Sequence, residues 1–116
     1  MGEQELKART KIFALRVMKL VGDLPDGAVA KTIGNQHIRS GTSVGANYRA
    51  ACRGRSKAEF IAELGIVVEE ADETCYWLEL IIEGHLFAAN LVEPLLQEAS
   101  ELTAIMVASR KTAGTR

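Results

Sequence analysis

The chain has 116 residues, of which 47% are hydrophobic and 25% are charged, and its formal net charge is −1. This length and composition are typical of one globular domain with its own hydrophobic core, and they exclude an intrinsically disordered protein. The near-zero net charge gives no overall attraction to nucleic acid or to an anionic membrane. No segment approaches the ~20 apolar residues of a membrane span, and the charged first residues lack a signal-peptide core. We therefore expect a cytoplasmic protein that is not embedded in a membrane.

The first predicted helix covers residues 5–22, because apolar residues recur there at helical spacing and a glycine follows them. Its apolar stripe consists of Leu6, Phe13, Val17 and Leu20. Residues 23–27 are rich in turn formers, and Asp26 is a candidate N-cap for the next helix.

The second predicted helix covers residues 28–53 and has an unusual composition. Its interior contains Gly34, Gly41 and Gly45, which together cost about 3 kcal/mol of helix propensity relative to alanine. We favour the interpretation that a neighbouring helix approaches closely over these small residues. The alternative is a kink near Val44-Gly45-Ala46.

The third predicted helix covers residues 57–83. Ser56 and Glu59 match a capping box at its start, and Gly84 ends it. Its apolar stripe consists of Phe60, Leu64, Val67, Ala71, Leu78 and Ile82. The fourth predicted helix covers residues 91–111 and has Pro94 in its first turn. Four long helices with short connections predict an all-α, antiparallel up-and-down four-helix bundle in a single domain, residues 1–116.

Charge is sharply partitioned along the chain. Residues 28–57 hold six basic residues and no acidic one, whereas residues 58–84 hold eight acidic residues and no basic one. In the interpretation that we favour, the basic helix lies beside the acidic helix of the same or another subunit, and the charges select orientation. In the alternative, a basic cluster at one end of the bundle binds phosphates. The candidate nucleic-acid- or partner-binding residues are Arg39, Arg49, Arg53, Arg55 and Lys57.

The sequence gives little support to an active site. Cys52 and Cys75 would lie roughly 24 Å apart along antiparallel helices, so we expect reduced thiols. His37 and His85 do not complete the Glu-x-x-His pattern of di-iron bundles, and no catalytic triad or phosphate-binding loop can be placed. We expect no catalytic residue, no metal site and no cofactor. An enzyme with inward-facing carboxylates is a further hypothesis, which would require a bound metal in the purified protein.

The stretch from Gln36 to Phe60, QHIRSGTSVGANYRAACRGRSKAEF, resembles the four-helix-bundle family encoded in intervening sequences of bacterial 23S rRNA genes, also called the S23 family. Phe13-Ala14-Leu15-Arg16 and Glu69-Glu70-Ala71-Asp72-Glu73 are also similar to that family. Many members have Ser-Ile-Pro-Ser-Asn where this chain has Ser43-Val44-Gly45-Ala46-Asn47, and a leucine where this chain has His37.

The resemblance implies an antiparallel bundle that assembles as a homopentameric ring and has no enzymatic activity. It also implies a relationship to the accessory protein of diversity-generating retroelements, which is thought to bind a reverse transcriptase and nucleic acid. On the second helix, His37 can share a stripe with Gly41, Val44 and Tyr48. We expect it to form hydrogen bonds at an interface there. The candidate oligomer or close-packing residues are Gly41, Val44, Gly45, Tyr48 and Trp77.

Two functional hypotheses follow. The leading one is a non-enzymatic, homo-oligomeric bundle that acts as a binding or scaffolding module, with itself as its main partner. The alternative is an RNA- or DNA-binding accessory protein that uses the basic residues near the turn between the second and third helices.

Overall fold

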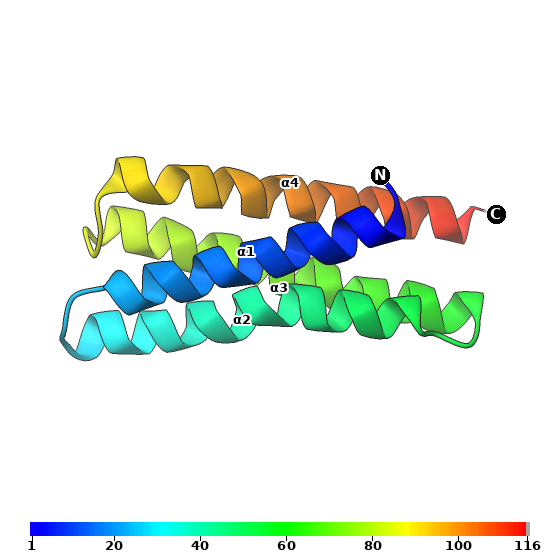
Figure 1. Ribbon diagram of the computed structural model, residues 1–116, viewed down its shortest axis with the longest axis horizontal. Coiled ribbons are helices and arrows are strands. Elements are labelled where there is room, and N and C mark those ends of the chain that lie inside the picture. The colour runs from blue at the N-terminus through cyan, green and yellow to red at the C-terminus, as the bar shows by residue number, and fades with distance from the viewer. Residues whose placement is uncertain (116) are drawn as a thin grey trace.

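The computed structural model describes residues 1–115, and within them it has four α-helices and no strand (Figure 1). The helices are α1 (Glu3–Asp23), α2 (Ala28–Cys52), α3 (Lys57–Glu83) and α4 (Ala89–Gly114). Each observed helix end lies within three residues of the position that the sequence predicted. The prediction of an all-α, four-helix bundle is confirmed.

The helices form an elongated bundle with dimensions of 47 × 21 × 20 Å. In the order α1, α2, α3, α4, each helix packs on the next, and α1 packs only lightly on α4. The two diagonal pairs, α1 with α3 and α2 with α4, make no substantial contact among the described residues. Both chain ends and the α2–α3 turn lie at one end of the bundle, and the other two connections lie at the opposite end (Figure 1).

One hydrophobic core runs along the bundle and receives side chains from every helix. Its largest fully buried apolar side chains are Phe13, Val17, Val44, Leu64, Val67, Leu78, Ile81, Val92, Leu102 and Met106. The spacing of these residues within each helix follows the helical period, as do the predicted apolar stripes. A difference lies near the end of α3, which buries Ile81 completely, whereas Ile82, which the sequence placed on the stripe, is only partly buried.

Short-range chemistry fixes the start of α3. The Ser56 hydroxyl oxygen accepts a hydrogen bond from the Glu59 backbone N–H at 3.1 Å. The Glu59 carboxylate in turn accepts the Arg55 backbone N–H at 2.8 Å. The reciprocal pair satisfies two N–H groups that would otherwise lack a partner at a helix start.

The start of α2 differs from the expectation. Gly27, not Asp26, occupies the N-cap position, and no side chain caps this helix. Gly27 has φ 128°, a backbone conformation that residues with a Cβ atom rarely adopt. The path of the turn therefore requires glycine at position 27, and that path leaves Asp26 outside the capping position.

The start of α4 also lies earlier than predicted. The helix begins at Ala89, which places Pro94 inside the helix rather than in its first turn. Val92 is completely buried, so the turn that contains it must already be helical for its side chain to enter the core. Packing therefore outweighs the loss of the one backbone hydrogen bond that Pro94 cannot donate.

The end of α3 depends on His85. Gly84 is the C-cap, but His85 has the positive φ, at 55°, that glycine normally supplies after a helix. His85 donates its backbone N–H to Ile82, and Leu86 donates its own to Ile81, which is a Schellman motif.

Replacing His85 with glycine should raise the free energy of unfolding by about 0.5–1 kcal/mol, because glycine adopts this φ without strain. Chemical denaturation at pH 7 measures the change. His85→Ala is the matched control, since alanine retains the strain and should give no gain. A glycine variant no more stable than the alanine variant would contradict the interpretation.

The glycines of α2 bring α1 close. A Cβ atom added at Gly41 would lie 2.8 Å from a methyl group of Val17, and one added at Gly45 would lie 3.1 Å from the Thr10 hydroxyl. A Cβ atom at Gly34 would meet Leu24 at 3.2 Å. The glycines of α2, which is helical without interruption from Ala28 to Cys52, therefore allow the close approach of a neighbouring segment that we favoured from the sequence.

His37 lies on the same buried stripe of α2 and has no exposed surface. Neither ring nitrogen has a hydrogen-bond partner among the described residues. The expected hydrogen-bonded role is therefore wrong. Burial lowers the pKa of His37 from its ordinary value of 6.5 to about 4, because the uncharged ring is the form that an apolar interior accepts.

Candidate interaction surfaces

Arg39 joins α2 to α3 through ion pairs. Its guanidinium lies 3.2 Å from Glu70 and also contacts Glu73. The Trp77 indole N–H donates a hydrogen bond to Glu73 at 2.9 Å, and this bond together with Arg39 lowers the pKa of that carboxyl. At this point the basic helix lies beside the acidic helix of the same subunit, so Arg39 is engaged within the bundle.

The other four residues of the predicted basic cluster are exposed. Arg53, Arg55 and Lys57 lie at the α2–α3 turn, and Arg49 lies one helical turn before Arg53 on α2. None of the four forms an ion pair in the part of the chain that the structure describes. The structure thus separates Arg39 from the remaining members of the cluster.

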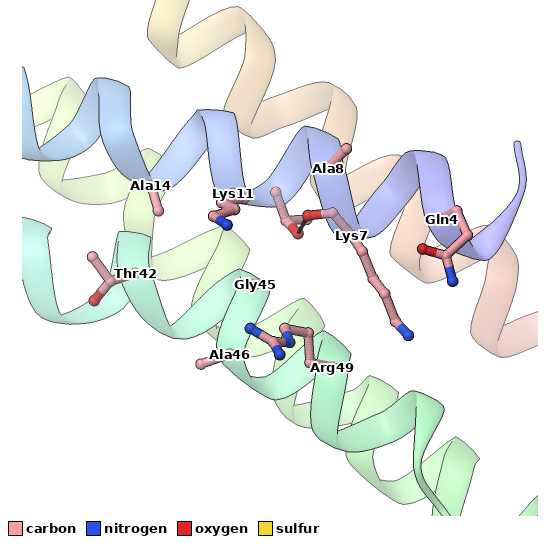
Figure 2. A pocket seen from close by; sticks show the side chains of 10 residues that line it. Gln4, Lys7, Ala8, Lys11, Ala14, Thr42, Gly45, Ala46 and Arg49 are labelled. Atoms are coloured by element: carbon pink, nitrogen blue, oxygen red, sulfur yellow. Dashed lines mark hydrogen bonds between the residues drawn. The ribbon is translucent and has the colours of Figure 1, made fainter.

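Arg49 also lines a groove between α1 and α2 (Figure 2). The groove has a volume of about 640 Å³, and Lys7 and Lys11 of α1 line it together with Arg49. Its other lining residues are Gln4, Ala8, Thr10, Ala14, Thr42, Gly45 and Ala46. Lys7 and Lys11 were not among the residues predicted from the sequence, although their spacing of four residues places them on one side of a helix.

The predicted close-packing residues divide into two groups. Gly41, Val44, Gly45 and Tyr48 all contribute to packing inside the subunit: Val44 and Tyr48 in the core, and the two glycines against α1. Trp77 is half-buried on α3, and its ring meets that of the exposed Tyr76 edge-on, with 5.1 Å between the ring centres.

A second groove, which we call the apolar groove, lies between α1 and α4 and has a volume of about 450 Å³. It exposes large side chains: Ile12 is 58% exposed, Leu15 55% and Leu91 62%. The remaining lining residues are Arg16, Lys19, Leu20, Asp23, Phe87 and Leu95. This groove was not predicted from the sequence, although apolar residues of the first helix that lie off its main stripe, such as Ile12 and Leu15, were a signal for it.

An ion pair joins α1 to α4 beside the apolar groove. Arg9 on α1 contacts both carboxylate oxygens of Glu98 on α4, at 2.7 and 2.8 Å, and also contacts Glu101 at 3.0 Å. Such two-pronged contacts of arginine with a carboxylate fix orientation well. The two helices are therefore clamped beside the apolar groove, since Arg9 precedes Ile12 by three residues and Glu98 follows Leu95 by three residues.

The carboxylates of α3 do not converge on an internal site. Glu69, Asp72, Glu79 and Glu83 are all exposed along its outer face. Among the described residues, no group of three or more His, Cys, Asp or Glu side chains is arranged to hold a metal ion. Cys52 and Cys75 are free and half-buried, and burial raises the pKa of both thiols.

The family model described as 23S rRNA-intervening sequence protein matches residues 3–108 of this chain, which include all of α1, α2 and α3 and most of α4. The chain belongs to the 23S rRNA-intervening sequence protein family. A comparison with curated proteins finds no match.

A solved structure of another member agrees with this assignment. It is a protein of unknown function from the S23 ribosomal protein family of Bacteroides thetaiotaomicron, 32% identical to this chain. The similarity covers 96% of this chain and 99% of that one, with a TM-score of 0.84. In this member of the 23S rRNA-intervening sequence protein family, no helix of the described residues is long and apolar enough to cross a membrane.

Proposed function

We propose that this member of the 23S rRNA-intervening sequence protein family is a non-enzymatic, homo-oligomeric helical bundle that acts as a binding or scaffolding module. The observation that carries the proposal is the apolar groove, where Ile12, Leu15 and Leu91 are each more than half exposed. Contiguous exposed apolar surface on a small bundle marks an interaction site.

A homopentamer is the assembly that the family resemblance implies, and a closed ring suits the charge distribution. Most soluble homo-oligomers have closed symmetry, and ring assemblies use two different surfaces of each copy. The bundle has contrasting surfaces, because residues 7–19 of α1 carry five basic residues and no acidic one, whereas α3 is strongly acidic.

Light scattering coupled to size-exclusion chromatography tests the assembly. We expect a mass of five protomers at micromolar concentration, little changed by dilution, because a ring must break two interfaces to release one copy. A mass of one protomer under these conditions would contradict the proposal. A stable assembly of another number would keep the homo-oligomer and reject the pentamer.

A second candidate function is the binding of RNA or DNA, as in an accessory protein of rRNA intervening sequences or of a reverse transcriptase. It is favoured by one observation: Arg49, Arg53, Arg55 and Lys57 are exposed and form no ion pair among the described residues. Free basic side chains are the groups that neutralise phosphates.

The double variant Arg53→Ala/Arg55→Ala should weaken binding of a labelled single-stranded RNA about tenfold or more at low salt and reduce the salt dependence of binding. A gel-shift titration at several salt concentrations measures both. Lys31→Ala is the control, since Lys31 is an exposed base at the far end of α2 and should have little effect. Absence of RNA binding by the unmodified protein at low ionic strength would reject this candidate.

A further inference from the structure

The outer face of α3 has the form of an interaction surface. Its exposed residues recur every three or four positions, so they lie in one row along the helix. The row, which we call the acidic stripe, consists of Ile66, Glu69, Asp72, Tyr76, Glu79 and Glu83. Its carboxylates form no ion pair within the described residues.

Tyr76 is the largest exposed side chain of the stripe. It is 53% exposed, and the edge-on contact with Trp77 holds its ring. Exposed tyrosines supply large contact area at low conformational cost and are enriched at the centre of protein interfaces. Asp72 and Glu79 flank it, one turn away on either side.

The apolar groove has the complementary chemistry. Ile12, Leu15 and Leu91 line it with exposed apolar surface. Arg16, Lys19 and Asp23 also line it, and the Lys19 ammonium lies 2.9 Å from the Asp23 carboxylate. Arg16 forms no ion pair among the described residues, so the rim keeps a net positive charge, and a groove with apolar walls and such a rim fits an aromatic anchor that is flanked by carboxylates.

The two surfaces also lie at the same height in the bundle. Tyr76 precedes the end of α3 by seven residues, and Arg16 precedes the end of α1 by seven residues. Both helices run toward the same end of the bundle (Figure 1), so each residue lies about 10 Å from that end at ~1.5 Å per residue. Lys19 and Glu79 also lie at equal heights, because each precedes the end of its helix by four residues. Rotation about an axis parallel to the bundle preserves height, so it brings these surfaces of two copies together.

The surfaces lie apart on one subunit. α1 and α3 are diagonal neighbours that make no substantial contact within the described chain, so one copy cannot bring its own stripe to its own groove. A pairing between different surfaces of successive copies is the heterologous contact that builds a ring.

We propose that the apolar groove between α1 and α4 of one copy receives Tyr76 and the acidic stripe of the next copy, with Arg16 and Lys19 facing Asp72 and Glu79. The inference rests on the proposed homo-oligomer and identifies the two surfaces that form it. The groove between α1 and α2 that Lys7, Lys11 and Arg49 line takes no part in this contact and remains free for another ligand.

Two single variants and their mixture test the pairing. Leu15→Glu places a carboxylate in the groove, and Tyr76→Ala removes the anchor of the stripe. Both positions are exposed, so neither change disturbs the core. Each variant alone should be a monomer by light scattering. An equimolar mixture at the highest attainable concentration should form a dimer, because the intact stripe of the first variant fits the intact groove of the second.

Val107→Glu is the control, since Val107 is an exposed apolar residue of α4 outside the groove, and its variant should keep the assembly. Circular dichroism confirms that each variant folds. If the unmodified protein assembles and either variant keeps the full mass, the pairing is wrong and the homo-oligomer stands. A mixture that remains monomeric also overturns the pairing. An unmodified protein that is itself a monomer contradicts the homo-oligomer instead.

Discussion

His37→Leu is expected to raise the free energy of unfolding by about 2 kcal/mol at pH 7. His37 is completely buried and both ring nitrogens lack partners, so leucine of similar size removes two unsatisfied polar atoms from the core. Chemical denaturation monitored by circular dichroism, at fixed protein concentration, measures the change. A less stable variant would show that the imidazole has a partner in solution.

The same substitution should remove an acid sensitivity. The pKa of His37 is about 4 in the folded protein and near 6.5 in the unfolded chain, so the unfolded chain binds the proton more readily between these values. The contribution to stability is complete above pH 6.5 and is lost as the pH falls toward 4. Between pH 7 and pH 5 the loss is about 2 kcal/mol.

The leucine variant should therefore lose about 2 kcal/mol less stability than the unmodified protein over that interval. His85→Asn serves as the control, because it removes the other histidine and leaves His37 in place. Its stability should retain the pH dependence of the unmodified protein. Equal slopes for the leucine variant and the unmodified protein would contradict the assignment to His37.

Gly41→Ala and Gly22→Ala should have opposite effects on stability. A Cβ atom at Gly41 would lie 2.8 and 2.9 Å from the two methyl groups of Val17, a stiff and fully buried side chain. The clash costs about 1–3 kcal/mol and exceeds the gain of about 1 kcal/mol in helix propensity. Nothing lies within 4 Å of a Cβ atom at Gly22, so only the propensity gain applies there.

A double-mutant cycle tests the cause. Val17→Ala removes the two methyl groups that the new Cβ atom would meet, so Gly41→Ala should cost about 2 kcal/mol less in that background. Thermal or chemical denaturation of the four proteins gives the coupling energy. Additive effects, or a stabilising Gly41→Ala, would show that α1 does not approach α2 as closely as the structure describes.

The fold followed from the sequence because its signals are local. The apolar stripe through Phe13 and Val17 has the helical period, and Ser56 with Glu59 marks a helix start through hydrogen bonds within one turn. Where expectation and structure differ, a neighbouring element decides: burial of Val92 extends α4 upstream past Pro94, and the path of the α1–α2 turn gives the cap position to Gly27.

The candidate surfaces were predicted only in part. The sequence predicted the exposed basic cluster, because its members lie close together in the chain at a predicted turn: Arg49, Arg53, Arg55 and Lys57. The groove partners Lys7 and Lys11 come from a helix more than thirty residues away. Sequence order does not reveal which faces of two helices meet, so those partners required the structure.

By itself the sequence determined the four helices, their apolar faces and the separation of basic from acidic segments, since each depends on residues within a few turns of one another. Only the tertiary structure decided which charges are engaged, leaving Arg39 paired with Glu70 and Glu73 and the acidic stripe open. It also decided that α1 and α4 part to expose Leu15 and Leu91. These outcomes depend on the rotation and spacing of packed helices, which long-range contacts fix together.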